Sequence, residues 1–414
     1  MTTYPRSPYE ARPTEKGWRM NVRLVADKTA SVDALQRYPS ITALIEEKRP
    51  VLPYYALHPE RFKLAAKRFL DEFPGTTMYA VKANPAIPVL DQIYASGVRH
   101  FDTASLAEIE LIRGRYGDAI CHFMAPVRLP GHAAAAWNQY GIQDFVVDSE
   151  QELDKLLSET EGGKDLRIFV RIATPLGGAI LELSSKFGTK PEHGAKLLKR
   201  IADSGATPAL TFHVGSQCLS PFTYAQAVEM SRRAAIAADV RIAALDVGGG
   251  FPHAYPGNDV PPHHWYFDTI RESLTTFPLD SNAELLCEPG RALCAEGCTL
   301  INRVILNKGD ALFLNDGKYG NMDELCQPGW SAEYARKVYW LDENGRARER
   351  TGAPKQFRIY GPTCDTVDVL PQPMTLPEDI ALNDFIVYEN AGAYSAACRT
   401  QFNGLYADDW AIVE

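Results

Sequence analysis

The segment MYAVK at residues 78–82 is followed by RHFD at 99–102, ICHFM at 120–124 and DFVVD at 144–148. Each segment is short, apolar and strand-like, and amphipathic windows such as SLAEIELIRGR at 105–115 separate them. The alternation continues with strand-like segments at 167–173, 209–214, 242–247 and 284–288, and with helical windows at 149–158 and 192–204. Eight β/α units over about 210 residues match a (β/α)8 barrel in number and length. An open, doubly wound α/β sheet is the alternative that this pattern leaves open.

The part of the chain after residue 300 has a different hydrophobic pattern. Short strand-like runs recur there, with few helical windows, at 299–306, 311–315, 336–341, 356–360, 384–388 and 410–413. This pattern is typical of a β domain of roughly 110 residues. We therefore predict three parts: an N-terminal segment at 1–48 that joins the β domain, the barrel at 49–298, and the C-terminal β domain at 299–414.

Composition excludes several classes of protein. Of 414 residues, 45% are hydrophobic and 23% charged, which is typical of a globular protein and excludes a disordered one. The net charge of −9 argues against a nucleic-acid partner. Eight cysteines without a C-x-x-C pair indicate reduced thiols and no metal site. Without the apolar core of a signal peptide or a run of about 18 apolar residues, we expect a cytoplasmic protein with no membrane span.

Chemically unusual residues gather at the ends of the predicted barrel strands. Active sites of (β/α)8 barrels lie at the C-terminal ends of the strands. The residues found there are Lys82, Asp102, Ser105, Glu108, Arg171, His213, Ser216, Gly248 to Gly250, and Glu288 to Arg291. Taken singly, a lysine can extend to solvent, a histidine can belong to the core, and glycines can form a turn. Their common placement at one barrel mouth favours a functional site.

The same residues supply what one cofactor requires. Pyridoxal 5′-phosphate (PLP) needs a lysine for its aldehyde, a cup for its phosphate, a flat partner for its ring and an acid at its pyridine nitrogen. Lys82 and His213 suit the first and third roles, and Glu288 suits the fourth. The triple glycine, with Ser216 and Arg291 beside it, suits the phosphate. The sequence therefore predicts a PLP site at the barrel mouth.

Longer motifs around these residues resemble a known family. Four runs resemble the fold-type III PLP-dependent decarboxylases: Tyr79-Ala80-Val81-Lys82-Ala83-Asn84, His213-Val214-Gly215-Ser216, 245–252 (LDVGGGFP) and Glu288-Pro289-Gly290-Arg291. Three more resemble its ornithine decarboxylase branch: Gly361-Pro362-Thr363-Cys364-Asp365, Gly392-Ala393-Tyr394 and Phe402-Asn403-Gly404. They occur in the family's order from about residue 50 to 406. The resemblance implies an alanine-racemase-like barrel, a C-terminal β domain and a homodimer with shared active sites.

The resemblance also implies roles for individual residues. The implied cofactor-binding residues are Lys82, Arg171, His213, Ser216, Gly249, Gly250, Glu288, Gly290, Arg291 and Tyr394. The implied catalytic residues are Lys82, His213 and Cys364, where Cys364 comes from the other subunit and delivers a proton to the substrate Cα. Asp365, beside Cys364, matches the carboxylate that binds the distal ammonium of the substrate. Glu108 and Arg171 match supporting positions near the cofactor, and Tyr394 also matches a substrate-binding position.

The substrate is an amino acid whose identity the motifs narrow. Cys364-Asp365-Thr366 stands where diaminopimelate decarboxylases usually read Cys-Glu-Ser, which favours a substrate with a bare terminal amine. Ornithine, decarboxylated to putrescine, is the leading candidate. Lysine and 2,4-diaminobutyrate are close alternatives, and diaminopimelate is a weaker one.

One segment departs from the ornithine decarboxylase pattern. After Asn315-Asp316-Gly317-Lys318-Tyr319-Gly320, that branch continues into a short helix whose aromatic–aspartate pair meets the substrate. This chain instead reads NMDELCQPGW at 321–330. Asp323 or Glu324 is the candidate replacement for the aspartate, and the alternative is that both begin a solvated helix.

Two other functions are possible for a protein with this fold. A non-catalytic regulatory homologue is disfavoured because Lys82, Cys364 and Asp365 are all retained. A racemase keeps the α-carboxylate of its substrate and needs a second base on the opposite face of the ring. The Cys364 motif fits decarboxylation better, so we predict a PLP-dependent decarboxylase.

Overall fold

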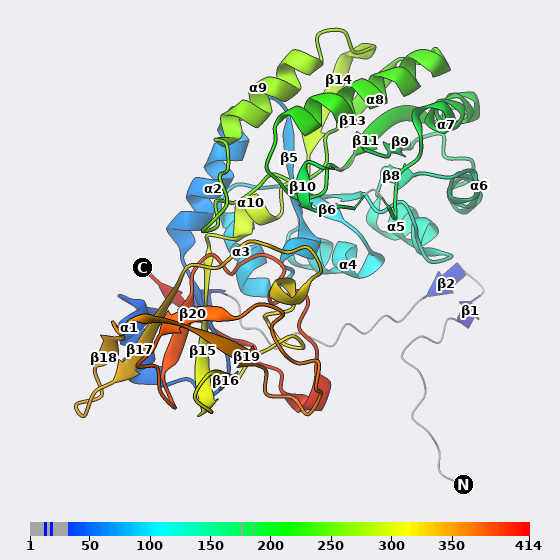
Figure 1. Ribbon diagram of the computed structural model, residues 1–414. Helices are drawn as coiled ribbons and strands as arrows, with labels where there is room; N and C mark the ends of the chain where they lie inside the picture. The colour runs from blue at the N-terminus through cyan, green and yellow to red at the C-terminus, as the bar shows by residue number, and fades with distance from the viewer. Residues whose placement is uncertain (1–11, 15–16, 20–31, 175–176, 184) are drawn as a thin grey trace.

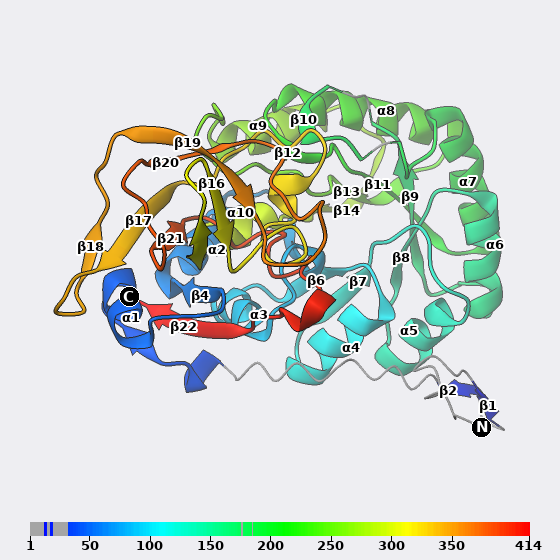
Figure 2. The same cartoon turned by 60° about the horizontal axis from the view of Figure 1, so that its bottom comes forward.

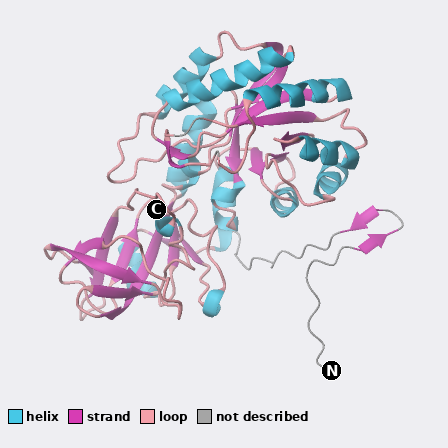
Figure 3. Cartoon of the chain, turned by 45° about the vertical axis from the view of Figure 1, so that its right-hand side comes forward, coloured by secondary structure: helices cyan, strands magenta, loops and turns pink. Residues whose placement is uncertain are grey.

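The computed structural model describes residues 12–14, 17–19, 32–174, 177–183 and 185–414 (Figure 1). Much of the predicted N-terminal segment, namely residues 1–11, 15–16 and 20–31, therefore lies outside the described part of the chain. The described residues form a barrel with surrounding helices and, beside it, a domain built mainly of strands (Figures 2 and 3). The predicted combination of a (β/α)8 barrel and a β domain is confirmed, and the open-sheet alternative is excluded.

The barrel is a closed ring of eight parallel strands within the described residues. In chain order these are β5 (Thr76–Ala80), β6 (His100–Thr103), β7 (Ile120–Phe123), β8 (Asp144–Val147), β9 (Arg167–Ile172), β11 (Thr207–Phe212), β13 (Ile242–Asp246) and β14 (Leu279–Cys287). The ring closes where β14 pairs with β5, through Leu286 opposite Thr76 and Cys287 opposite Thr77. This pairing puts the two ends of the predicted barrel sequence side by side.

Helices connect the strands and cover the outside of the barrel. They are α2 (Pro59–Glu72), α3 (Ile87–Ala95), α4 (Leu106–Arg115), α5 (His132–Tyr140), α6 (Glu150–Glu159), α7 (Pro191–Ser204), α8 (Phe222–Ala238) and α9 (His263–Ser273), with the short α10 (Arg291–Cys294) after β14. At least two of these helices begin at a serine that caps the first turn. Ser105 and Ser149 accept hydrogen bonds from the backbone N–H of Glu108 and Glu152, as helix N-caps do.

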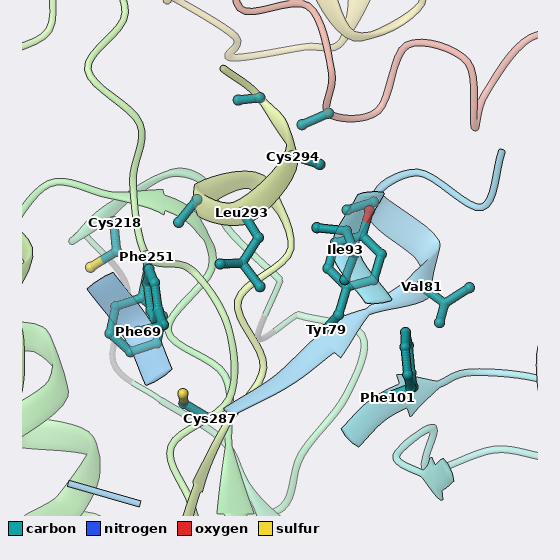
Figure 4. Packing of buried hydrophobic residues seen from close by; sticks show 14 of the residues in the cluster. Phe69, Tyr79, Val81, Ile93, Phe101, Cys218, Phe251, Cys287, Leu293 and Cys294 are labelled. Atoms are coloured by element: carbon teal, nitrogen blue, oxygen red, sulfur yellow. The ribbon is translucent and has the colours of Figure 1, made fainter. Parts of the chain in front are cut away.

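Two apolar layers hold the barrel together. Inside the ring lies a small cluster of buried side chains from the strands and from Met124, which follows β7: Met78, Met124, Val146, Phe169, Ala209, Ala244 and Leu286. A larger cluster fills the space between the strands and the helices and continues into the second domain. Figure 4 shows part of it, where Phe69 of α2 meets Phe251 edge to face with ring centroids 5.3 Å apart. Because the strands are buried on both faces, they read as continuous apolar runs in the sequence.

The second domain is a twisted sheet whose strands come from both ends of the chain. Its strands are β3 (Arg37–Tyr38), β4 (Tyr54–Leu57), β15 (Cys298–Asn307), β16 (Ala311–Leu314), β17 (Arg336–Leu341), β18 (Ala347–Glu349), β19 (Pro354–Tyr360), β20 (Met374–Pro377), β21 (Phe385–Tyr388) and β22 (Asp409–Val413). Helix α1 (Ile41–Lys48) lies between β3 and β4. β4 pairs with β15 and β22. The division at residues 48 and 298 stays a proposal, and β4 favours moving its first boundary to after Leu57.

Smaller elements complete the described chain. They are the hairpin of β1 (Arg12–Thr14) and β2 (Gly17–Arg19), the pair of β10 (Ala179–Leu181) and β12 (Ser216–Cys218), and the 3-10 helices η1 (Val32–Ala34), η2 (Val81–Ala83), η3 (Glu324–Cys326) and η4 (Phe402–Gly404). Among the described residues, no helix combines the length and hydrophobicity that a membrane span requires.

A network of charged side chains lies at the N-terminal end of the barrel strands. Asp144 accepts hydrogen bonds from Nδ1 of His122 (2.5 Å) and from Nε and Nη2 of Arg167 (2.8 and 2.6 Å). Arg167 also pairs with Glu284 at 2.7 Å. Burial would raise the pKa of Asp144, but these donors outweigh it and lower the pKa from 3.8 to about 2. The ionised carboxylate is thus bound more strongly in the folded protein.

We predict that Asp144→Asn destabilises the barrel at pH 7 by about 3 kcal/mol, because it leaves part of a buried ion pair uncompensated. The stability that the wild-type carboxylate contributes is complete above its ordinary pKa of 3.8 and is lost as pH falls through about 2. The difference between variant and wild type in urea unfolding, followed by circular dichroism, is therefore expected to shrink between pH 5 and about pH 2. Asp154→Asn, in an exposed pair with Arg200, is the control and is expected to cost under about 1 kcal/mol.

Candidate active site

The ends of the barrel strands surround a small cavity. Its lining residues come from β5 and η2, from β12, from the segments that follow β11, β13 and β14, and from the segment after β21 in the second domain: Ala80, Lys82, His213, Ser216, Gln217, Gly249, Gly250, Phe251, Glu288, Gly290, Arg291 and Tyr394. Nine of the ten residues predicted to bind the cofactor lie in this lining. The tenth, Arg171, lies on β9 close enough to His213 and Glu288 to act on them electrostatically.

Lys82 follows directly after β5, in the 3-10 helix η2. Its ammonium donates a hydrogen bond to Asp102 on β6, and the two side chains are 38% and 1% exposed. Burial would lower the pKa of Lys82, but the carboxylates of Asp102 and Glu288 outweigh it and raise that pKa. Lys82 is therefore a charged amine whose ammonium is held by a buried carboxylate. The sequence places Asp102 at the barrel mouth but predicts no role for it.

His213 lies at the end of β11 as a neutral imidazole. Its Nδ1 accepts a hydrogen bond from the backbone N–H of Gly215 at 3.1 Å, which fixes the orientation of the ring. Burial, and then the positive charges of Arg171 and Lys82, hold the pKa of His213 well below its usual value. A flat, uncharged ring of this kind can stack against an aromatic cofactor.

Glu288 and Asp246 form a buried pair of carboxyl groups behind the cavity. Asp246 accepts hydrogen bonds from the hydroxyl of Thr211 (2.7 Å) and the backbone N–H of Gly248 (3.0 Å). Burial raises its pKa to about 6. Burial raises the pKa of Glu288 well above its usual value, and the charges of Asp102 and Asp246 add to the effect. Glu288 therefore carries a proton that it can share with a ring nitrogen. Asp246 is its partner, a role that the sequence pattern did not predict.

The loop after β13 brings its backbone close to the cavity. A Cβ on Gly249 would lie 2.7 Å from the carbonyl oxygen of Glu288 and 3.0 Å from Nε2 of His213. Gly250 has a φ of +96°, and a Cβ there would lie 2.4 Å from the carbonyl oxygen of Gly215. Only glycine therefore fits at these two positions, as in loops that cradle a phosphate.

Arg291 lies at the same end of the cavity and is almost fully buried. Its Nη2 donates to the hydroxyl of Ser216 at 3.0 Å and its Nη1 to the hydroxyl of Tyr255 at 3.1 Å. Its Nε is buried and has no hydrogen-bond partner among the described residues. A guanidinium with a free N–H beside a glycine loop fits a phosphate. Together with the lysine, the neutral histidine and the protonated glutamate, this arrangement fits PLP.

The segment at 321–330 holds the two candidate replacements for the missing aspartate, Asp323 and Glu324. Glu324 is buried and paired with Arg291, through Nη1–Oε2 at 2.9 Å and Nη2–Oε1 at 2.5 Å, and accepts a third hydrogen bond from the hydroxyl of Tyr334. Arg291 and Tyr334 thus use both of its oxygens, and its candidate role in place of the missing aspartate stays a prediction. Asp323 accepts a hydrogen bond from Gln327 at 2.7 Å and does not line the cavity. Its role in substrate binding stays a prediction.

Cys364 and Asp365 also lie outside the cavity of their own chain. Cys364 is exposed, and its backbone N–H donates to the side chain of Asn403 at 3.0 Å. The hydroxyl of Tyr319 donates to Asp365 and lowers the pKa of that carboxyl below its usual value. The loop thus presents a thiol and an ionised carboxylate side by side.

Glu108 is the remaining acid near the barrel mouth. It accepts a hydrogen bond from the backbone N–H of Ala104 at 2.6 Å, at the start of α4. Burial raises its pKa to about 7, opposed by that hydrogen bond, and the charge of Asp102 raises it further. The supporting role implied for Glu108 stays a prediction.

Comparisons with known proteins place this site in a family. Residues 59–295 match the family model described as the pyridoxal-dependent decarboxylase, pyridoxal binding domain. A lysine/ornithine decarboxylase of Selenomonas ruminantium is 30% identical over 347 residues, which cover 81% of this chain and 83% of that protein. Mouse (Mus musculus) ornithine decarboxylase is 29% identical over 367 residues, covering 81% and 75% of the two chains.

A solved structure agrees with these matches. The lysine/ornithine decarboxylase of Vibrio vulnificus, complexed with putrescine, superposes with a TM-score of 0.73 at 26% identity and covers 91% of this chain and 99% of its own. The predicted fold-type III resemblance, the PLP cofactor and the decarboxylase activity are confirmed. The chain belongs to the pyridoxal-dependent decarboxylase family and is a PLP-dependent decarboxylase of basic amino acids.

Proposed function

We propose that the substrate is L-ornithine, that the product is putrescine, and that the active site is completed across a homodimer. Lysine and 2,4-diaminobutyrate are the alternatives, and diaminopimelate is a weaker one. The observation that carries the proposal is the placement of Asp365 beside Cys364 on an exposed loop. The relatives act, by their names, on lysine, ornithine or both. A diamino acid brings a distal ammonium that needs a compensating carboxylate when it is desolvated.

The loop of Cys364 supports a shared site. Lys82 lies in the barrel cavity and Cys364 outside it, so one chain does not bring the two groups together. Large apolar side chains, Val367, Phe402 and Leu405, are exposed in the same region. Phe402 packs on Tyr319, the hydrogen-bond partner of Asp365, with ring centroids 4.7 Å apart. Apolar surface around reactive groups suits an interface that a second copy of the chain covers.

The residues of the barrel would act in a defined order. When bound, PLP supplies an electron sink for the bond between Cα and the carboxylate. Lys82 would hold the cofactor through its aldehyde, and Asp102, as the hydrogen-bond partner of Nζ, would orient the amine. Glu288 would donate its proton toward the ring nitrogen, and the neutral His213 would pack on the ring. Cys364 of a partner chain then supplies the proton that replaces the departing carboxylate at Cα.

The first prediction from this proposal concerns Lys82. Borohydride reduction of the purified enzyme, followed by peptide mapping, is expected to place the pyridoxyl group on Lys82. Lys82→Ala is expected to keep the fold, as judged by circular dichroism, and to lower kcat by about 100-fold or more. Lys67→Ala, on the exposed face of α2, is the control and is expected to leave kcat unchanged. A pyridoxyl group on another lysine would contradict the assignment of Lys82 as the residue that binds the cofactor.

The second prediction concerns Asp365. Asp365→Asn is expected to lower kcat/KM for ornithine by roughly 30-fold or more, because truncating a charged partner of a desolvated ammonium costs on the order of 2–5 kcal/mol. The kcat/KM for norvaline, which has the same carbon chain but no distal amine, is expected to fall far less. Equal losses for both substrates would mean that Asp365 supports the fold or the dimer. Asp310→Asn, in an exposed pair with Lys355, is the matched control.

The third prediction tests the dimer. Mixing inactive Lys82→Ala and Cys364→Ala chains under subunit exchange generates one site per heterodimer with both wild-type residues. Activity is then expected to recover to about a quarter of the wild-type level for random exchange. If heterodimers are verified by differential tagging and remain inactive, the proposal that two chains share the active site is wrong.

A further inference from the structure

The positive charge of Arg291 is paired with a carboxylate of its own chain, that of Glu324. Glu324 accepts one hydrogen bond from each terminal nitrogen of Arg291, and both side chains are 3% exposed. Tyr334 donates to the same carboxylate at 3.0 Å, so its position is held from both sides. Glu324 lies in the segment at 321–330, where the chain departs from the ornithine decarboxylase pattern.

The surroundings of Arg291 hold it in one place. The ring centroids of Trp330 and Tyr394 lie 4.7 and 5.0 Å from its guanidinium carbon, within the range of cation–π contacts. Tyr255 and Ser216 take the remaining hydrogens of the terminal nitrogens. The N–H of Nε has no partner among the described residues, and Ser216 lies at the same end of the cavity. A phosphate in the glycine cup would therefore meet an arginine whose charge Glu324 already balances.

We infer that Glu324 sets the affinity for the cofactor: its carboxylate repels the cofactor phosphate across their common partner Arg291 and so weakens phosphate binding. The inference rests on the proposed assignment of Arg291 to the phosphate. Two anions on one buried guanidinium repel each other through a medium of low polarity, where charges interact more strongly than in water. Without phosphate, the same carboxylate compensates a charge that is costly to bury alone. Glu324 thus favours the protein without cofactor over the protein with it.

The test compares two ligands that differ only in the phosphate. Full-length protein, stripped of cofactor by dialysis against hydroxylamine, is titrated with PLP and with pyridoxal while the cofactor absorbance is followed. Glu324→Gln keeps the size of the side chain and removes its charge. It is expected to lower the Kd for PLP by about tenfold and to leave the Kd for pyridoxal within about twofold of wild type. PLP is also expected to raise the unfolding temperature of the variant more than that of wild type.

Two control variants separate the possible causes. Glu152→Gln removes the charge of another buried carboxylate paired with an arginine, Arg128, away from the cavity lining. It is expected to lower stability without changing the ratio of the two Kd values. Arg291→Gln is expected to raise the Kd for PLP and to leave the Kd for pyridoxal unchanged. If it does not, the assignment of Arg291 to the phosphate fails, and the inference about Glu324 fails with it.

Two results would overturn the inference while leaving the proposed function intact. One is a Kd for PLP that is unchanged or higher in Glu324→Gln while Arg291→Gln weakens PLP binding, which would mean that Glu324 only positions Arg291. The other is a Glu324→Gln chain that does not fold even with PLP present. That outcome would show that phosphate cannot replace Glu324 as the partner of Arg291.

Discussion

Closure of the barrel is the constraint on which the site depends. The first and last strands, β5 and β14, pair through two residues each, although about 210 positions separate them in the chain. Lys82 follows one of these strands and Glu288 the other, so the pairing puts the amine and the acid in one cavity. The backbone N–H of Ala80 also donates to the carbonyl oxygen of Pro289 at 3.3 Å, which extends the contact to the residues of the site. Any change that opens this seam would separate the two groups.

The balance of charge inside the barrel mouth explains why its residues have unusual proton affinities. The carboxyl groups of Asp102, Asp246 and Glu288 share a small buried volume with the cations of Lys82 and Arg171. Since like charges in a buried site cannot all ionise, one proton stays on the Asp246–Glu288 pair. The same carboxyl groups include Asp102, which holds the ammonium of Lys82 by a hydrogen bond. The protonated acid and the positioned ammonium thus come from one arrangement of buried charges.

The second domain does more than cover the barrel. The backbone N–H of Tyr394 donates to the carbonyl oxygen of Ala83 at 2.8 Å, and the side chain of Asn84 donates to the carbonyl oxygen of Gly392, also at 2.8 Å. These bonds tie the lysine-bearing turn to the loop that contributes Tyr394 to the cavity. Glu324 reaches Arg291 from the same domain. The β domain therefore contributes to the site of its own chain, and Cys364 lies outside that cavity, on the exposed surface that we propose a second copy covers.

The sequence by itself determined the barrel, the β domain and the cofactor. Apolar periodicity and helix caps act over a few residues, and the motifs around Lys82, Gly250 and Glu288 carry their chemistry in adjacent positions. Only the tertiary structure decided which groups pair. Asp246 with Glu288, and Arg291 with Glu324, meet across 42 and 33 positions, and β4 joins β15 across more than 240. No periodicity encodes such contacts, because they depend on where the folded elements meet. For that reason Glu324, which in the sequence is one acid among 52 acidic residues, became a partner of Arg291 only in the folded chain.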